Sequence, residues 1–227
     1  MIKNIVFDIG GVLIRFMPGE AMRKLAIPEE KIAPLLKASV YCKWWQELDR
    51  GFFDEEEVMR YMQEDAPEYA KDIAYFMMNG KREVVEAFDY SAEWLKGLQE
   101  RGYHTYLLTN YPASYYDLHS KEKFTFMPYV NGQIVSSYVE MIKPDPNIYR
   151  TLLDTYDLKE EECVFIDDRK ENVEAAKKLG FHGIRFESYE QVENLLERFS
   201  RKARGEGCKG HQLTSREKRG LYKLHRM

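Results

Sequence analysis

Short apolar runs alternate along the chain with longer segments whose apolar residues recur at helical spacing. Five runs are short and rich in β-branched or aromatic side chains, which is typical of strands buried on both faces of a sheet. They lie at residues 5–11, 105–110, 133–137, 163–168 and 183–186. Most of the intervening segments repeat apolar residues at i, i+3 and i+4. The alternation predicts an α/β fold: a parallel sheet with helices on both faces.

Helix ends can be assigned at several positions. Ser91 is predicted to cap a helix that ends at Gly102, because serine is a favoured N-cap and glycine a favoured stop. Asp54 and Glu57 stand in the N-cap and N3 relationship ahead of another helical pattern. The Ser91–Gly102 and Asp54–Glu57 pairs therefore predict helix boundaries from local sequence alone.

One long stretch interrupts the alternation. From about residue 16 to 88 only helical patterns occur, and Pro28 and Pro67 are each placed to open a helix. We interpret this stretch as an all-helical insert that covers the sheet edge. The predicted division is an α/β core of residues 1–15 and 89–200, a helical cap of 16–88, and a basic C-terminal tail of 201–227, which we expect to be disordered.

Composition restricts the cellular setting. No apolar run approaches the ~18 residues needed to cross a bilayer, and the N-terminal run meets Asp8 before a signal-peptide stretch is complete. The three cysteines, at positions 42, 163 and 208, are widely spaced and odd in number, which fits a reducing compartment. We therefore expect a cytoplasmic protein with no membrane partner.

The net charge of −4 conceals an asymmetry. Residues 201–227 hold nine Lys/Arg and two Asp/Glu, so the first 200 residues carry a net −11. A body this acidic repels a phosphate backbone, and we expect no nucleic-acid partner. A polyanion-binding arm is the alternative interpretation of the tail. The oligomeric state is left open.

Polar residues stand where the predicted strands end. In an open parallel sheet the carboxyl ends of the strands form the ligand-binding edge. Singly, each fragment there also fits a turn, a helix cap or a surface ion pair. Together they supply a nucleophile, a hydroxyl, a cation and a carboxylate pair: Asp8 with Gly10 and Gly11, Thr109 with Asn110, Lys143, and Asp167 with Asp168.

The carboxylates predict a metal. Asp167 and Asp168 repel one another unless a cation sits between them, and Asp8 should converge on the same edge. Oxygen ligands without His or Cys indicate Mg²⁺. One Asp8 oxygen would then remain free to attack the phosphorus of a bound phosphate ester.

The other polar residues suit a phosphoryl group. Lys143 would neutralise its charge and Thr109 would donate a hydrogen bond to it. Main-chain N–H groups around Gly10 and Asn110 would add further donors. The predicted partner is therefore a small phosphorylated metabolite.

The segments VFDIGGVL, LLTN, IKPDPNIY and VFIDDRKENVEAA, in this order, resemble the four motifs of the haloacid dehalogenase-like hydrolases, a superfamily of mostly Mg²⁺-dependent phosphatases. The resemblance covers residues 1 to about 199. It implies a Rossmann-like core and a helical cap that closes the site and selects the substrate. Six residues could line that closure or belong to the cap's own core: Arg15, Phe16, Trp44, Trp45, Phe52 and Phe53.

The resemblance also implies residue roles. The catalytic residues would be Asp8 as nucleophile, Thr109 and Lys143. The phosphate-binding residues would be Gly10, Thr109, Asn110 and Lys143. The metal would be held by Asp8, the main-chain carbonyl of Gly10 and Asp168, with Asp167 nearby or acting through water.

One position departs from the family pattern. Most phosphatases of this family carry a second Asp two residues after the nucleophile, as acid and base, and here that position is Gly10. Losing such a group typically costs ~10²–10⁴ in rate, unless the leaving group is already good. The Asp-x-Gly variation resembles a branch containing α-D-glucose-1-phosphate phosphatases. We therefore predict a sugar 1-phosphate or a similar small phosphate ester as substrate.

Three functional hypotheses follow. The leading one is a Mg²⁺-dependent phosphohydrolase that works through an aspartyl-phosphate on Asp8. The alternative is a catalytically silent phosphate-binding or regulatory module, because Gly10 replaces the acid/base; the retained carboxylates and Lys143 count against it. A 2-haloacid dehalogenase is a minor alternative, disfavoured by the Asp167–Asp168 pair, since attack on carbon leaves no phosphate charge to balance.

Overall fold

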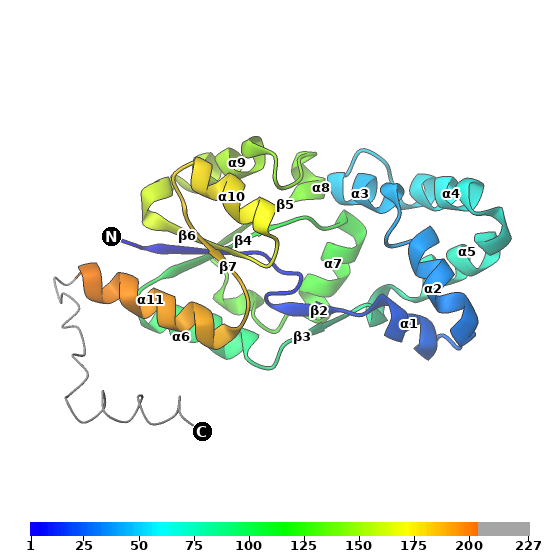
Figure 1. Cartoon of the computed structure of the whole chain (residues 1–227), viewed down its shortest axis with the longest axis horizontal. Helices are drawn as coiled ribbons and strands as arrows, with labels where there is room; N and C mark the ends of the chain where they lie inside the picture. The colour runs from blue at the N-terminus through cyan, green and yellow to red at the C-terminus, as the bar shows by residue number, and fades with distance from the viewer. Residues whose placement is uncertain (204–227) are drawn as a thin grey trace, which may run out of the picture.

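The five predicted strand segments form one parallel sheet in the computed structural model of the chain, which describes residues 1–203 (Figure 1). The strand order is β5-β4-β1-β6-β7, and every neighbouring pair is parallel. The predicted α/β fold is thereby confirmed. The strands are β1 (Asn4–Phe7), β4 (His104–Thr109), β5 (Gly132–Val135), β6 (Cys163–Asp167) and β7 (His182–Arg185).

Helices cover both faces of this sheet. Alternate residues of β1 point to opposite faces, so Ile5 and Phe7 pack in one apolar cluster and Val6 in the other. The first cluster contains residues of α6 (Ser91–Glu100), α7 (Ala113–Glu122) and α11 (Tyr189–Ala203); the second contains residues of α9 (Pro146–Tyr156) and α10 (Lys170–Lys178). In Figure 1, α9 and α10 lie on one side of the sheet and α6 and α11 on the other.

A separate group of helices follows the first strand. In Figure 1 they form the blue-to-cyan unit beside the sheet. The Asp54–Glu57 capping box is confirmed, with each side chain accepting a hydrogen bond from the other residue's main-chain N–H. The helices are α1 (Pro18–Lys24), α2 (Glu29–Ala38), α3 (Lys43–Arg50), α4 (Glu55–Asp65) and α5 (Ala70–Asn79), with 3₁₀ turns η1 (Pro67–Tyr69) and η2 (Lys81–Glu83).

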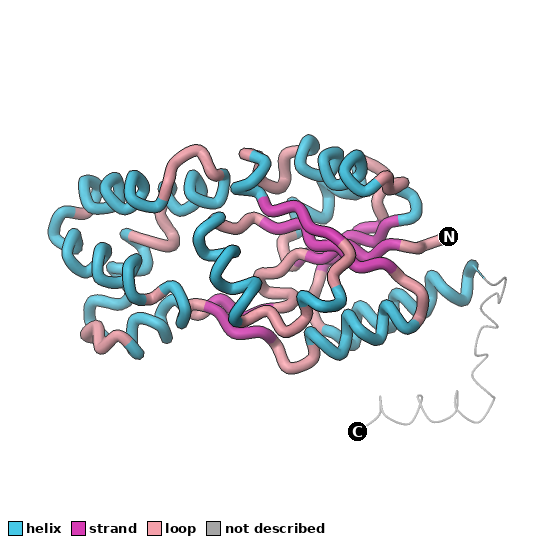
Figure 2. The backbone as a smooth tube through the Cα atoms, turned by 180° about the vertical axis from the view of Figure 1, so that it is seen from behind, coloured by secondary structure: helices cyan, strands magenta, loops and turns pink. Residues whose placement is uncertain are grey.

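Two short strands join the helical unit to the core. Strands β2 (Ile14–Phe16) and β3 (Val85–Ala87) pair antiparallel, so the chain leaves and returns through one ribbon (Figure 2). The expectation of no strand between residues 16 and 88 is therefore wrong at this ribbon. Each strand has only three residues, with the exposed pair Arg15 and Glu86 at its centre. Runs this short give no strand signal.

The predicted cap at Ser91 is also wrong. The N-cap of α6 is Tyr90, and no side chain caps this helix. The Ser91 hydroxyl instead donates a hydrogen bond to the carbonyl oxygen of Leu13 (2.7 Å), and the Tyr90 hydroxyl donates to that of Val12 (2.8 Å). Both side chains therefore tie α6 to the loop that follows β1.

Helix α11 runs into the first residues of the predicted C-terminal tail. The part of the predicted tail from residue 204 onward lies outside the described residues, and α11 extends to Ala203. Among residues 1–203, no helix is both long and apolar enough to span a bilayer. Helix α11 packs against the core through Val192 and Leu196, which are both buried.

Candidate active site

The carboxyl ends of three neighbouring strands bring the predicted side chains together. Asp8 follows the central strand β1, Thr109 ends β4 on one side, and Asp167 ends β6 on the other. Lys143 reaches the same place from the segment before α9. All four residues are buried, and each is at least nine-tenths withdrawn from solvent. This edge is where open parallel sheets bind ligands.

Lys143 forms a buried bridge between two carboxylates. Its Nζ lies 2.9 Å from Oδ1 of Asp8 and 2.7 Å from Oδ2 of Asp167. Asn110 fixes the Lys143 backbone: its amide Nδ2 donates to the Lys143 carbonyl (3.0 Å), and the Lys143 N–H donates to Asn110 Oδ1 (2.8 Å). The Asn110 side chain thus positions the lysine.

Asp167 is saturated by donors from the protein. Its Oδ1 accepts from the Arg169 N–H (2.8 Å), and both oxygens lie within 3.0 Å of Asn172 Nδ2. Lys143 takes the remaining place on Oδ2. The sequence analysis missed Asn172, which is buried in the first turn of α10. Its place five residues after Asp167, inside the segment VFIDDRKENVEAA, was the available signal.

Negative charge exceeds positive charge at this edge. Oxygens of Asp8, Asp167 and Asp168 lie within 4.8 Å of one another. Burial raises the pKa of Asp8 to about 7; Lys143 opposes the rise, and Asp167 and Asp168 add to it. Burial alone would lower the pKa of Lys143, but Asp8 and Asp167 together raise it. Oxygen donors crowded in this way fit a hard divalent cation such as Mg²⁺.

Thr109 and Gly10 indicate room for a bound group, whereas Gly11 packs closely against Asp168. Among the described residues, Oγ1 of Thr109 is a buried polar atom without a hydrogen-bond partner, and such atoms are rare unless a ligand or water satisfies them. A Cβ added at Gly11 would lie 2.7 Å from Asp168 Oδ2, and this residue has a φ of +70°, so glycine is required there. A Cβ added at Gly10 would meet no atom within 4 Å.

A cavity of about 510 Å³ lies over Asp8. Its polar lining includes Lys143, Asp168 and Arg169, and much of the remaining wall is apolar or aromatic. Helix α3 contributes part of the wall, so the cavity lies between the helical unit and the core. The wall also contains Phe16, Trp45, Asp49, Tyr111 and His119.

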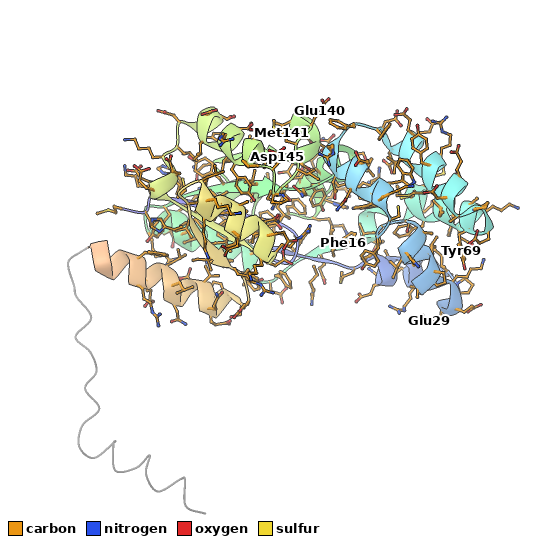
Figure 3. All side chains as sticks on the ribbon, turned by 45° about the horizontal axis from the view of Figure 1, so that its top comes forward. Phe16, Glu29, Tyr69, Glu140, Met141 and Asp145 are labelled. Atoms are coloured by element: carbon orange, nitrogen blue, oxygen red, sulfur yellow. The ribbon has the colours of Figure 1, made fainter. Side chains whose placement is uncertain are left out.

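The six residues suggested for the closure divide between cavity and cap. Phe16 and Trp45 line the cavity, and Figure 3 shows Phe16 where the core and the helical unit meet. Trp44 and Phe53 pack against Tyr61 inside the helical unit. Of the remaining two, Arg15 pairs with Glu86 and Phe52 is exposed beside Arg50.

Asp49 is a cavity residue that the sequence analysis missed. It lies in the last turn of α3, and its main-chain carbonyl accepts a hydrogen bond from the Ser136 hydroxyl of α8 (Ser136–Val139). Ser136 Oγ also accepts from the Tyr111 N–H (2.9 Å). Burial raises the pKa of Asp49 to about 8, helped by the Asp8 charge and opposed by Arg169 and Lys143. No sequence signal separates this Asp from an ordinary surface carboxylate.

The end of α3 docks closely on α8. Gly51 follows the helix with a φ of +85°, and a Cβ there would lie 2.3 Å from the carbonyl oxygen of Ser137. Only glycine allows this approach. The docking holds Asp49 over the strand ends and closes one side of the cavity.

Comparison with known proteins supplies the family context. A profile of the haloacid dehalogenase-like hydrolases matches residues 2–180. Flavin mononucleotide hydrolase 1 of Arabidopsis thaliana is 28% identical over 168 residues, which cover 71% of this chain and 65% of that protein. The D-ribitol-5-phosphate phosphatase of Bacteroides thetaiotaomicron is 24% identical, covering 80% of this chain and 90% of that protein.

A solved structure shares the fold. An enzyme of the haloacid dehalogenase family from Bacteroides thetaiotaomicron, in complex with magnesium and inorganic phosphate, matches with a TM-score of 0.66 at 22% identity. The match covers 85% of this chain and 99% of that one. It therefore extends over both the sheet and the helical unit.

Proposed function

The chain belongs to the haloacid dehalogenase-like hydrolases, and from that membership we propose that it is a Mg²⁺-dependent phosphohydrolase that forms an aspartyl-phosphate on Asp8. The observation that carries the proposal is the cluster at the strand ends, where buried Asp8 and Lys143 lie beside the exposed Asp168 and open to a cavity. The named relatives act on phosphate compounds, which supports the same reaction class.

The metal would be held by Asp8, the main-chain carbonyl of Gly10 and Asp168. Asp167 serves a different role in this proposal, because its oxygens are already occupied by Lys143, Asn172 and the Arg169 N–H. When bound, Mg²⁺ neutralises carboxylate charge and so allows an anionic phosphate to approach. Asp167 then holds Lys143 in place.

Hydrolysis proceeds in two displacements. A carboxylate oxygen of Asp8 bonds to phosphorus while the bond from phosphorus to the leaving oxygen breaks. The Lys143 ammonium and the unpartnered Thr109 hydroxyl stabilise the charge on the transferring group. Water then attacks phosphorus, the bond to Asp8 breaks, and inorganic phosphate leaves.

The substrate class rests on two arguments. Gly10 in place of an acid favours an ester with a good leaving group, such as a sugar 1-phosphate. The named relatives instead include a D-ribitol-5-phosphate phosphatase, so sugar-alcohol phosphates belong on the same panel. We propose a small phosphorylated metabolite, with the anomeric phosphate as the finer hypothesis.

The first experiment measures phosphate release from an aryl phosphate and a panel of sugar phosphates, with Mg²⁺ or with EDTA. The wild type should release phosphate only with Mg²⁺, and Asp8→Asn should abolish release because the nucleophile is lost. Glu174→Gln, at an exposed ion pair on α10, is the matched control and should retain full activity.

Other outcomes separate the alternatives. Activity that survives in EDTA and in Asp8→Asn would contradict the mechanism. No release from any ester by folded protein would favour the phosphate-binding module. A faster reaction with sugar-alcohol phosphates than with anomeric phosphates would overturn the finer substrate hypothesis alone.

A further inference from the structure

We propose that Asp49 of the cap helix α3 is the general acid and general base that Gly10 cannot supply, an inference that rests on the proposed phosphohydrolase function. The reaction needs a proton at the leaving oxygen and later a base for the attacking water. Gly10 has no side chain, and no atom lies within 4 Å of the position that a Cβ would take there. For an ester with a poor leaving group, the proton must therefore come from another group that lines the cavity.

The carboxyls available for this role are few. In the described part of the chain, the cavity is lined by three carboxyls, those of Asp8, Asp49 and Asp168. Asp8 is the proposed nucleophile and Asp168 a proposed metal ligand. The Asp49 carboxyl forms no hydrogen bond or ion pair with any other described residue. It remains free to contact a substrate.

Two other proton carriers in the wall, His119 and Tyr111, are already engaged. His119 Nδ1 lies 2.8 Å from the Tyr111 hydroxyl, and its Nε2 lies 2.6 Å from the Lys81 carbonyl oxygen. A ring with both nitrogens occupied, one of them on a carbonyl, has no proton to give to a ligand. Tyr111 is committed to the same pair, and burial raises its pKa well above the ordinary value.

The position of Asp49 is fixed by contacts between the two units. Ser136 of α8 bonds to the Asp49 carbonyl and receives the Tyr111 N–H. Close packing of Gly51 on Ser137 holds the helix end against the core. These contacts hold Asp49 in the wall of the cavity that Asp8 also lines.

The surroundings of Asp49 favour its protonated form. The charged groups that face it are Asp8, Lys143 and Arg169, and the Tyr111 phenol is also close enough to interact. Burial and the Asp8 charge raise its pKa to about 8, against the two cations. A protonated carboxyl can donate to the leaving oxygen, and a pKa near the working pH suits a group that must act in both directions.

The proton balance closes over the two displacements. Asp49 gives its proton to the leaving oxygen as the phosphorus–oxygen bond of the ester breaks and the bond to Asp8 forms. The Asp49 carboxylate then takes a proton from water as the water oxygen bonds to phosphorus and the bond to Asp8 breaks. Each turnover returns both residues to their starting states.

The test compares Asp49→Asn with Glu47→Gln, a control on the same helix whose side chain pairs with Arg50. With an alkyl phosphate, D-ribitol 5-phosphate, Asp49→Asn should lose ~10²–10⁴ in kcat because the leaving oxygen receives no proton. With p-nitrophenyl phosphate, which needs no proton, the first release of nitrophenolate should stay near the wild-type rate. Slow turnover should follow that burst, because the base is missing.

A rescue variant separates chemistry from structural damage. The rescue variant adds Gly10→Asp to Asp49→Asn, and an Asp side chain fits the open space at position 10. The double variant should have a kcat at least tenfold higher than that of Asp49→Asn alone. A variant that merely misplaced the cap would lose activity equally on both esters and would not be rescued.

Two results would overturn the inference. One is an Asp49→Asn enzyme with unchanged kcat on D-ribitol 5-phosphate, and the other is an equal loss on both esters without rescue. Either result leaves the proposed function standing, provided that wild-type activity depends on Mg²⁺ and Asp8. Wild-type protein with no activity on any ester would overturn the function and the role of Asp49 together.

Discussion

At the scale of single residues, the site depends on one buried ammonium group that offsets the negative charges of two neighbouring carboxylates. Lys143 lies between Asp8 and Asp167, and all three are withdrawn from water. A buried charge without its partner is costly, because neither solvent nor a counter-charge compensates it. Lys143 therefore contributes to folding as well as to phosphate binding.

Replacing this lysine should destabilise the metal-free protein. Lys143→Met leaves two close carboxylates without their cation, and we expect the free energy of unfolding to fall by ~3–5 kcal/mol. Urea denaturation measures the change. Lys177→Met removes an exposed pair with Glu174 and should cost less than ~1 kcal/mol. Equal losses in the two variants would contradict the buried-pair account.

Asp49 should make stability depend on pH. Its pKa rises from 3.8 to about 8 on folding, so between these values the folded protein holds a proton that the unfolded chain releases. The free energy of unfolding therefore falls as pH rises from about 4 to about 8. Asp49→Asn removes this contribution and should have the higher melting temperature at pH 8, with little difference at pH 4. A variant less stable than wild type at pH 8 would refute the argument.

At the scale of elements, the eight-residue helix α3 links the helical unit to the strand ends. Its last turn carries Asp49, and Gly51 beyond it packs against the backbone of α8. The helix is short, but its end is fixed by contacts that no side chain larger than hydrogen would permit. Cap position and chemistry are therefore coupled through one helix terminus.

Two glycines test this coupling. Gly51 and Gly102 have nearly the same φ, +85° and +86°, but only Gly51 has backbone within the reach of a Cβ. Alanine at Gly102 should cost ~1–2 kcal/mol in stability, because the backbone is left-handed. Alanine at Gly51 should cost more, because its Cβ would also collide with the Ser137 backbone. Only Gly51→Ala should also reduce kcat/KM, by ~10–100-fold, since it displaces α3 from α8. Phosphate-release assays of both variants decide the point; equal activity would mean that the docking is unimportant.

Long apolar runs and long-range motifs made much of the core predictable. The strands that end at Thr109 and Asp167 contain the apolar runs 106–108 and 163–166. The fold that these runs predicted and the family resemblance that the motifs carried are confirmed. The ribbon Ile14–Phe16 with Val85–Ala87 was missed because three residues carry too little periodicity. The finer resemblance to glucose-1-phosphate phosphatases stays a prediction.

Within the site, residues at strand ends could be predicted from the sequence, whereas residues placed by tertiary contacts could not. The motif residues stand at strand ends, where topology alone brings them together. Asp49 lies in a polar helix far from any strand, and only the docking of α3 on α8 places it over Asp8. Ser91 was misassigned because its hydroxyl bonds to Leu13, a contact that depends on the fold.

At the scale of the whole molecule, the cavity belongs to both units. The core supplies Asp8, Lys143 and Asp168, and the helical unit supplies Trp45 and Asp49. A ligand that fills this cavity contacts both and should resist their separation. Occupancy should therefore stabilise the complete chain rather than one part of it.

Beryllium fluoride with Mg²⁺, which imitates a phosphoryl group on a carboxylate, should raise the melting temperature. At a ligand concentration 100-fold above Kd the gain is ~2.7 kcal/mol, or ~5–10 °C for a protein of this size. Thermal-shift measurements should show no such rise for Asp8→Asn, or for wild type in EDTA. A rise in the Asp8→Asn variant would mean that the ligand binds elsewhere.

The paired strands β2 and β3 have a consequence for exchange of parts between proteins. Ile14 lies opposite Ala87 and Phe16 opposite Val85, so the chain enters and leaves the helical unit at neighbouring points. Any segment whose two ends lie a strand spacing apart could be grafted onto this ribbon without disturbing the parallel sheet. The helical unit could therefore be exchanged as a whole. Chimaeras joined at the ribbon would combine a new specificity with the unchanged catalytic residues of the core. The grafted unit would have to supply its own general acid in place of Asp49.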